Sequence, residues 1–221
     1  MDYSDDPAAR RAEWFRYYSE KRITHQWFQV HLLQDLPEVR SVLEVGPGLG
    51  LVSAMLHNAG FSVTTLDRLP PQYAHPETEY LQAELADVEP GALSGFDCIL
   101  CCETLEHLYW DDVDGILSKF RDSGVPWLVI SVPYQGFQGE FRAYFNGHTA
   151  RQMMSLKSLK FLKKFTFDAE SDPYGHKWEV GYRGHGLKAL ESKLTGAGFR
   201  IHRRDFTSPT RSVFFVLQNP G

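Results

Sequence analysis

Short apolar runs rich in β-branched residues alternate with amphipathic stretches along most of the chain. The runs predict strands at 41–45, 61–66, 80–83, 96–101 and 127–132, and the stretches predict helices at 49–58, 111–121 and 186–196. This alternation is typical of an α/β protein with helices on both faces of a mostly parallel sheet. Two last strands, at 199–206 and 212–217, are separated by turn-forming residues and are predicted to pair antiparallel.

Two segments stand outside this alternation. Residues 7–35 carry apolar positions at near-helical spacing up to Pro37, which predicts one long helix. Residues 134–178 lack a regular pattern and are too long for an ordinary connection, which favours a lid or an acceptor-recognition insertion. We therefore expect one domain over 1–221, with residues 1–36 forming an N-terminal cap helix and residues 134–178 forming the lid.

Composition and charge narrow the possible partners. The net charge of −5 and the pI near 6.0 give no general attraction to nucleic acid or to an acidic membrane. No apolar run reaches the roughly 20 residues that cross a bilayer, and the acidic start is unlike a secretory signal. We expect a cytoplasmic protein without a membrane span and without a nucleic-acid partner.

The 3 cysteines, Cys98, Cys101 and Cys102, share one apolar run. In a strand they point to opposite faces, which suits packing and does not suit a tetrahedral metal site. We expect buried thiols and no bound metal.

A glycine loop stands between the first predicted strand and the helix that follows it. Gly46, Gly48 and Gly50 form a G-x-G-x-G pattern, and such glycines let the backbone approach a ligand near a helix N-terminus. The spacing differs from the G-x-G-x-x-G of dinucleotide sites, and the Lys-Ser/Thr of a phosphate-binding P-loop is missing. The loop predicts a nucleotide-bearing ligand.

Acidic residues follow the next two predicted strands. Asp67 ends the second strand, at the carboxyl edge where open α/β sheets bind ligands. A carboxylate there is able to hold both hydroxyls of a ribose. Glu84, after the third strand, stands where a carboxylate accepts a hydrogen bond from an adenine amino group.

Taken in order, these pieces resemble a class I S-adenosylmethionine-dependent methyltransferase. The motifs that carry the resemblance are Leu43–Gly50, Thr65–Asp67, Phe96–Leu108 and Leu128–Pro133, with Ala197–Ile201 similar to the start of the family's sixth strand. Leu105–Leu108 matches the Leu-Glu-His-Leu signature of the small-molecule branch. The resemblance implies a Rossmann-like, doubly wound, seven-stranded sheet with an antiparallel C-terminal strand.

The resemblance also implies S-adenosylmethionine as cofactor, S-adenosylhomocysteine as product, and a set of cofactor contacts. The glycines pass under the methionine portion, Asp67 binds the ribose, and the position of Glu84, where the family usually has Asp, contacts adenine. The implied cofactor-binding residues are Glu44, Gly46, Gly48, Gly50, Asp67, Arg68, Glu84, Leu85, Cys102, Glu103 and Tyr18. Glu44 supports the loop, and Cys102 with Glu103 faces the amino end of the cofactor.

Methyl transfer from a sulfonium is an in-line displacement that needs alignment and a dry pocket. A hydroxyl acceptor also needs a base, and histidine titrates near working pH. The candidates are His176, which we rank first, His107 and His148; each has an alternative scaffold role. Trp178 and Glu179 are candidates for framing the acceptor. The alternative for Trp178 is that it packs the lid onto the core.

The aromatic residues gather in the two segments expected to cover cofactor and acceptor. Of 30 Phe, Trp and Tyr residues, 7 lie in residues 1–31 and 10 in residues 134–178, which predicts an aromatic wall for the acceptor. Tyr17, Tyr18 and His25 are candidates for closing over the cofactor. Residues 151–164 hold interleaved lysines and apolar residues, as in a basic amphipathic helix that meets an anionic partner or is simply solvated.

We therefore expect an enzyme that methylates a small molecule or a glycan, on oxygen. Two alternatives stay open: methylation of RNA or protein, and a methyltransferase-like binding module without turnover. The negative charge and the absence of an Asn-Pro-Pro-Tyr or Asp-Pro-Pro-Tyr motif after the fourth strand disfavour the first, and the intact glycines with Asp67 disfavour the second.

Overall fold

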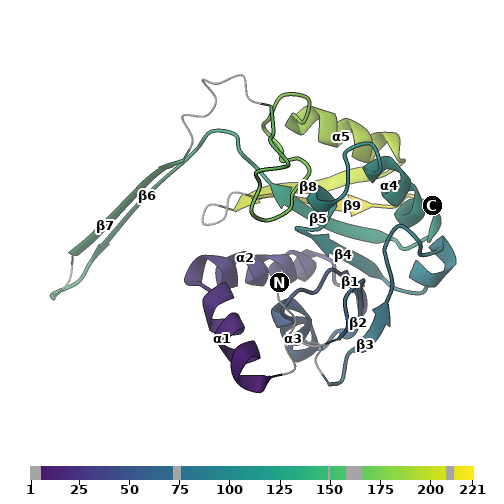
Figure 1. Cartoon of the computed structure of the whole chain (residues 1–221), viewed down its shortest axis with the longest axis horizontal. Helices are drawn as coiled ribbons and strands as arrows, with labels where there is room; N and C mark the ends of the chain where they lie inside the picture. Colours follow the sequence, from purple (N-terminus) through teal and green to yellow (C-terminus); the bar gives the residue numbers. More distant parts are fainter. Residues whose placement is uncertain (1–5, 72–75, 149, 158–165, 208–211) are drawn as a thin grey trace.

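A seven-stranded sheet forms the centre of the computed structural model, which describes residues 6–71, 76–148, 150–157, 166–207 and 212–221 (Figure 1). The strand order is β3-β2-β1-β4-β5-β9-β8. The strands are β1 (Ser41–Val45), β2 (Ser62–Asp67), β3 (Glu79–Gln82), β4 (Cys98–Cys102), β5 (Trp127–Pro133), β8 (Arg200–Thr207) and β9 (Ser212–Gln218). β1 to β5 are parallel and β9 is antiparallel to both of its neighbours, which confirms the predicted fold class.

Helices cover both faces of the sheet (Figure 1). α2 (Glu20–His31) and α3 (Leu51–Asn58) lie on one face, with α1 (Pro7–Tyr17) beside them, and α4 (Val113–Asp122) and α5 (Leu187–Gly196) lie on the other. Each face buries its own apolar cluster, as a doubly wound sheet requires. No helix among the described residues is long and apolar enough to cross a bilayer.

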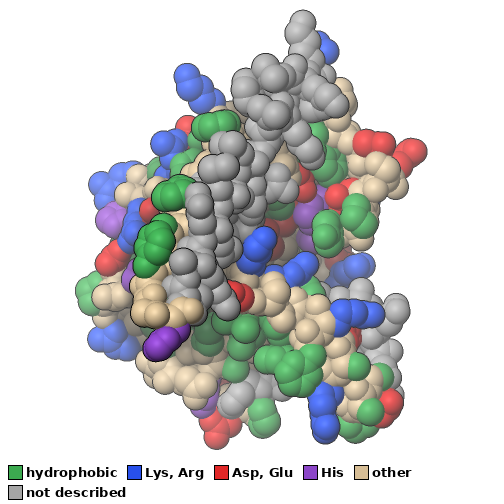
Figure 2. All heavy atoms as spheres, turned by 90° about the vertical axis from the view of Figure 1, so that its left-hand side faces the viewer, with side chains coloured by type: hydrophobic (Ala, Val, Ile, Leu, Met, Phe, Trp, Pro, Cys, Tyr) green, Lys and Arg blue, Asp and Glu red, His purple; other side chains and the backbone are tan. Residues whose placement is uncertain are grey.

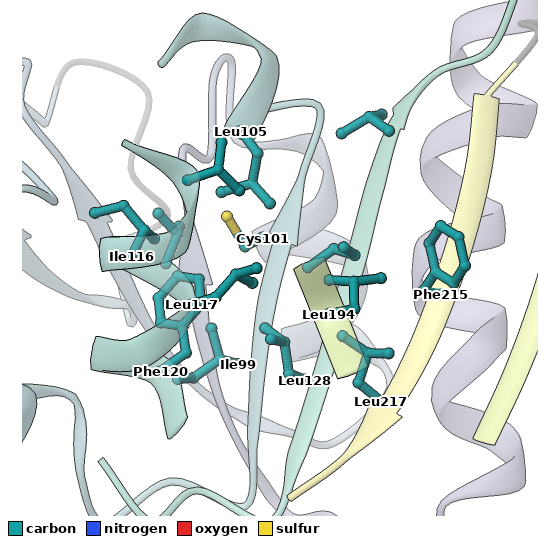
Figure 3. Close-up of a cluster of buried hydrophobic side chains, with 14 of the residues drawn as sticks. Ile99, Cys101, Leu105, Ile116, Leu117, Phe120, Leu128, Leu194, Phe215 and Leu217 are labelled. Atoms are coloured by element: carbon teal, nitrogen blue, oxygen red, sulfur yellow. The ribbon is translucent and has the colours of Figure 1, made fainter. Parts of the chain in front are cut away.

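β4 divides its side chains between the two clusters, because successive residues of a strand point to opposite faces. Ile99 and Cys101 pack among α4 residues such as Leu117, as Figure 3 shows, whereas Cys98 and Cys102 belong to the cluster on the other face. All three thiols are free and buried, as predicted, and burial raises their pKa values well above the usual range.

The N-terminal segment differs from the single helix predicted over 7–35. It consists of α1, α2 and a 3-10 helix, η1 (Leu32–Asp35). The break occurs because Tyr18 is extended and the Ser19 hydroxyl accepts a hydrogen bond from the Arg22 N–H at 3.4 Å, capping a new helix. A serine side chain that satisfies free N–H groups favours a helix start over continuation.

The segment predicted as a lid contains an antiparallel ribbon that projects from the body of the protein (Figure 1). Its strands are β6 (Gln138–Phe145) and β7 (Ala150–Lys157), paired over eight positions. The hypothesis of a basic helix over 151–164 is therefore wrong for residues 151–157, because their backbone groups are engaged by the facing strand. Lys160, Lys163 and Lys164 lie outside the described residues.

Backbone pairing closes this insertion at its base. The Gln135 N–H donates to the Val180 carbonyl at 2.7 Å, and the Val180 N–H donates to the Pro133 carbonyl at 3.0 Å. Trp178 is fully buried, and its indole N–H donates to the Leu108 carbonyl at 3.1 Å. Trp178 therefore packs the end of the insertion onto the core.

We expect the Trp178→Phe variant to lose about 1–3 kcal/mol of unfolding free energy, because a buried carbonyl loses its donor and the ring leaves a void. The matched variant Trp27→Phe should lose less than about 0.5 kcal/mol, since Trp27 is half exposed. Urea denaturation of both variants measures the difference. Equal losses would show that Trp178 is not an anchor.

Candidate active site

The glycine loop joins β1 to α3 at the carboxyl edge of the sheet. Gly46, Gly48 and Gly50 have φ angles of 73°, 56° and 76°, in the left-handed region that favours glycine. The Gly46 N–H donates to the Leu66 carbonyl at 2.9 Å, which fixes the loop to β2. Gly50 precedes α3 and offers no side-chain cap to the first N–H groups of the helix, of which that of Leu51 interacts with the Tyr18 phenol.

Thr104 makes glycine necessary at position 46 for a second reason. A Cβ at Gly46 would lie 2.7 Å from the Thr104 Oγ1. The Thr104 hydroxyl lies 3.0 Å from the Cys102 carbonyl and 3.3 Å from the Val45 carbonyl, so it bridges the ends of β4 and β1. Sequence reasoning did not single out Thr104, because its role arises from a neighbour that is 58 positions away.

Glu44 holds the loop from inside the sheet. Its carboxylate is buried, and the Ser53 hydroxyl of α3 donates to it at 2.5 Å. Burial raises the pKa of Glu44 to about 7, and the bond from Ser53 opposes this shift. β1 and α3 are therefore tied together on both sides of the glycines by Glu44 and Ser53.

The acidic residues after β2 and β3 lie at the same edge. The Asp67 carboxylate accepts from the Leu69 N–H at 3.0 Å, and the Asp67 carbonyl accepts from the Ala83 N–H at 2.9 Å. Arg68 and Glu84 form a 3.8 Å ion pair with both side chains more than half exposed. Leu85, next to Glu84, is buried. The side chains predicted to contact ribose and adenine are thus neighbours.

The end of β4 is strained at Glu103. Its φ of 51° is the only positive value of a non-glycine among the described residues. The Glu103 N–H donates to the Ser131 carbonyl at 2.9 Å, and the Ser131 hydroxyl donates to the Glu103 carboxylate at 2.8 Å. Backbone strain of this kind gathers at functional sites.

The N-terminal helices place His25 beside the end of β4 and Tyr18 beside the glycine loop. The His25 Nε2 lies 3.8 Å from the Glu103 carboxylate, and burial lowers the pKa of His25. Tyr18 is buried, which raises the pKa of its phenol, and its interaction with the Leu51 backbone opposes the shift. Both residues, which the sequence analysis expected to cover the ligand, thus lie beside the loop or the end of β4.

Two of the three candidate histidines meet. His107 belongs to the 3-10 helix η3 (Leu105–His107), and its ring packs edge-on against that of His176, with centroids 5.0 Å apart. Burial lowers the pKa of His107, and the neighbouring His176 adds to this effect. His148 is exposed in the turn between β6 and β7 and stands apart from this pair.

Carboxylates surround the His107–His176 pair. The His176 Nδ1 lies 3.0 Å from the Glu179 carboxylate, whose other oxygen accepts from the Gln135 amide at 2.6 Å. Glu106 is fully buried, and neither of its oxygens has a hydrogen-bond partner among the described residues. Burial raises the pKa of Glu106, and the charge of Glu103 adds to the shift. No local sequence pattern indicates this burial.

The expected aromatic wall stays a prediction: of the described rings of the insertion, that of Tyr174 stacks on His176 with centroids 5.6 Å apart. Phe137, Phe141, Tyr144 and Phe145 are more than half exposed in and beside the ribbon, and Trp178 is in the core. The site therefore consists of a helix N-terminus, carboxylates at the ends of β2 and β4, and the histidine pair. Such a set suits a nucleotide-bearing ligand on one side and proton removal on the other.

Comparison with known families identifies the domain. A family model described as "Methyltransferase domain" matches residues 15–164. A ubiquinone biosynthesis O-methyltransferase of Rickettsia prowazekii (strain Madrid E) is 28% identical over 113 residues, covering 43% of this chain and 44% of that protein. The enzyme of the same name from Rickettsia typhi (strain ATCC VR-144 / Wilmington) is 34% identical over 76 residues, covering 30% of each chain. These matches span less than half of each relative.

Solved structures share the whole fold at low identity. The N-methyltransferase NodS from Bradyrhizobium japonicum WM9, in complex with S-adenosylhomocysteine, has a TM-score of 0.63 at 14% identity and covers 99% of this chain and 94% of its own. The 1,6-didemethyltoxoflavin-N1-methyltransferase of Burkholderia thailandensis has a TM-score of 0.56 at 17% identity, with 99% and 92% covered. The glycopeptide N-methyltransferase MtfA has a TM-score of 0.58 at 11% identity, with 87% and 94% covered.

We expect Gly46→Ala to destabilise the protein by about 1–3 kcal/mol, because alanine combines a left-handed φ with the clash against Thr104. The matched variant Gly115→Ala lies in the exposed part of α4 with open space around it, and it should be neutral or stabilising by up to about 1 kcal/mol. Urea denaturation of both compares the positions. A neutral Gly46→Ala variant would contradict the close approach.

The burial of Glu44 makes the free energy of unfolding depend on pH. Its pKa rises from 4.5 to about 7 on folding, so the folded state binds the proton more tightly and its stability falls as pH rises through this window. Glu44→Gln, which keeps a side chain of the same size, should match the wild type near pH 4.5. At pH 8 it should be more stable by about 3 kcal/mol. Denaturation at both pH values measures this, and a pH-independent difference would refute it.

Proposed function

The chain belongs to the methyltransferase domain family and has the class I fold, and we propose that it transfers the methyl group of S-adenosylmethionine to a hydroxyl of a small molecule or glycan. The observation that carries the proposal is the loop of three left-handed glycines opening onto the α3 N-terminus, with Asp67 at the end of the next strand. Close backbone approach to a ligand accounts for three such glycines beside an acid, and Thr104 adds a second reason at Gly46.

The cofactor assignments are retained in this proposal. The glycines lie against the methionine portion, Asp67 holds the ribose hydroxyls, and Glu84 with Leu85 borders the adenine, flanked by Arg68. Cys102 and Glu103 lie at the amino end of the cofactor. Glu44 positions the loop, and Tyr18 covers the cofactor from the N-terminal helices.

The acceptor side is assigned to the His107–His176 pair. Thr104 touches the glycine loop and stands three residues before His107, so the pair lies next to the place proposed for the methyl group. A hydroxyl has to lose its proton as its oxygen attacks, and an imidazole oriented by a carboxylate, as His176 is by Glu179, suits that step. His148 stays a prediction that this cluster does not support.

A small acceptor is favoured over RNA by the distribution of charge. On the face shown in Figure 2, Lys and Arg side chains are interspersed with acidic and hydrophobic ones over the described surface. The described side chains of this face form no continuous basic track for a phosphate backbone, and the net charge of the whole chain is −5. The oxygen target is supported by the two matched relatives, which are named as O-methyltransferases.

The proposal is tested by calorimetry with S-adenosylmethionine and S-adenosylhomocysteine, and by transfer from methyl-labelled cofactor to the small-molecule, RNA and protein fractions of a cell extract. We expect both ligands to bind and the label to enter the small-molecule fraction. Asp67→Ala should weaken cofactor binding by about 10–100-fold, since a charged hydrogen-bond acceptor is lost. The exposed Asp122, at the far end of α4, provides the control Asp122→Ala, which should bind normally.

Absence of binding by either ligand would remove the cofactor from the proposal. Label found in RNA or protein alone would move the enzyme to that substrate class. Unchanged affinity in the Asp67→Ala variant would mean that the ribose lies elsewhere.

A further inference from the structure

The buried carboxyl group of Glu106 has no described partner that offsets the cost of its desolvation. Its carboxyl group has no exposed surface and no hydrogen-bond partner among the described residues. A buried carboxyl group without a partner is costly, and proteins keep one only where something else compensates it. The compensating group has to reach the carboxyl oxygens within the interior of the site.

The groups that face Glu106 are ligand groups for metals. One ligand atom each from Glu106, His107 and His176 lies within 4.8 Å of the others, and Asp172, His176 and Glu179 form a second such set through the shared histidine. Two imidazoles and a carboxylate at this separation are able to converge on one ion, because metal–ligand bonds of about 2.0–2.2 Å place ligand atoms roughly 3–4 Å apart.

His176 is oriented as a metal-binding histidine would be. Glu179 holds its Nδ1 at 3.0 Å, and Gln135 holds Glu179, so the Nε2 is the nitrogen left for a ligand. Such a carboxylate behind an imidazole fixes the ring and raises its basicity toward a metal. The Lys177 N–H donates to the Glu106 carbonyl at 2.7 Å, which links the two ligand-bearing segments.

The excess of acidic groups around the site also favours a bound cation. Glu106, Asp172 and Glu179 are gathered here, and the ion pairs described for these three carboxylates are only those of Asp172 and Glu179 with His176. The nearest lysine in sequence, Lys177, places its ammonium 5.6 Å from the centre of the Tyr109 ring. A divalent ion would neutralise the excess where no described Lys or Arg side chain does.

We propose that Glu106, His107 and His176 bind one divalent transition-metal ion, with Asp172 and Glu179 supporting His176 from behind. Two imidazoles with one carboxylate favour an ion of the Mn²⁺ to Zn²⁺ series over Mg²⁺ or Ca²⁺, which prefer oxygen ligands throughout. The expectation of no metal was based on the three cysteines, and no local sequence pattern shows that Glu106 is buried.

On the basis of the proposed function, we assign to this ion the activation of the acceptor hydroxyl. An ion held there would lower the pKa of a bound acceptor hydroxyl, whose proton would pass to solvent. The oxygen would then form its bond to the methyl carbon as the carbon–sulfur bond breaks, and the electron pair of that bond would neutralise the sulfonium. In the metal-bound enzyme, His107 and His176 would serve as ligands, and the ion would take over the activation of the hydroxyl that the proposed function assigns to the histidine pair.

Metal binding is tested first without the reaction. The untagged full chain, treated with EDTA and dialysed, is titrated with MnCl₂, ZnCl₂ and MgCl₂ by calorimetry, with Mn²⁺ also followed by electron paramagnetic resonance. We expect one Mn²⁺ or Zn²⁺ per chain and much weaker binding of Mg²⁺. Glu106→Gln, His107→Gln and His176→Gln should each weaken binding at least about tenfold, and Glu179→Gln should weaken it about 10-fold through the ring it orients.

Two controls separate ligation from folding. His202→Gln alters an exposed histidine of β8 and should bind the metal as the wild type does. Glu106→Gln removes a partnerless carboxyl and keeps its volume, so its metal-free melting temperature should equal or exceed that of the wild type. Mn²⁺ should raise the melting temperature of the wild type and not that of this variant.

Absence of saturable one-to-one binding, or equal binding by the wild type and all ligand variants, would overturn the proposal. A Glu106→Gln variant that unfolds without metal would also overturn it, since the carboxyl would then have a purely structural partner. Cofactor calorimetry on the same samples keeps the two proposals apart. Cofactor binding without metal binding overturns the metal site alone, and metal binding without cofactor binding overturns the proposed function alone.

Discussion

The contact between Thr104 and Gly46 sets the geometry of the whole site. It joins the ends of β1 and β4, the two central parallel strands, at the point where both leave the sheet. The glycine loop on one side follows a left-handed path at three glycines, and at Gly46 a side chain would meet Thr104. On the other side the chain turns through the strained Glu103 and carries Glu106 inward. One close approach thereby places the proposed cofactor and acceptor sides next to each other.

The sheet could be predicted closely because its strands are buried and short. The apolar runs of β1, β4 and β5 are bounded by turns, so the predicted ends agree with the structure to within about two residues. The N-terminal segment and the ribbon could not be predicted in the same way. Apolar spacing continues across Ser19, and only the capping bond reveals the break. β7 has a composition that suits a helix as well, and its pairing with β6 decides the outcome.

The residues of the candidate site differ in the same way between those with a local sequence signal and those without one. Gly46, Gly48, Gly50 and Asp67 could be found from sequence because a strand end and the residues after it carry their own signal. The contacts that join residues far apart in the chain gave none. Ser53 reaches Glu44 across a loop, and Glu106 meets His176, which lies 70 positions further along the chain. Burial of a carboxyl is a property of the packed fold and has no local pattern.

The pairing of Pro133 and Gln135 with Val180 has a consequence for how far the insertion can change in length. The chain leaves the sheet and returns at neighbouring points, so everything between them is a module on a closed stem. Lengthening or replacing the ribbon would change the loop-closure entropy only slowly, since that cost grows with the logarithm of length. A change in the length of the ribbon would thus leave His176, next to the stem, in register with Glu106.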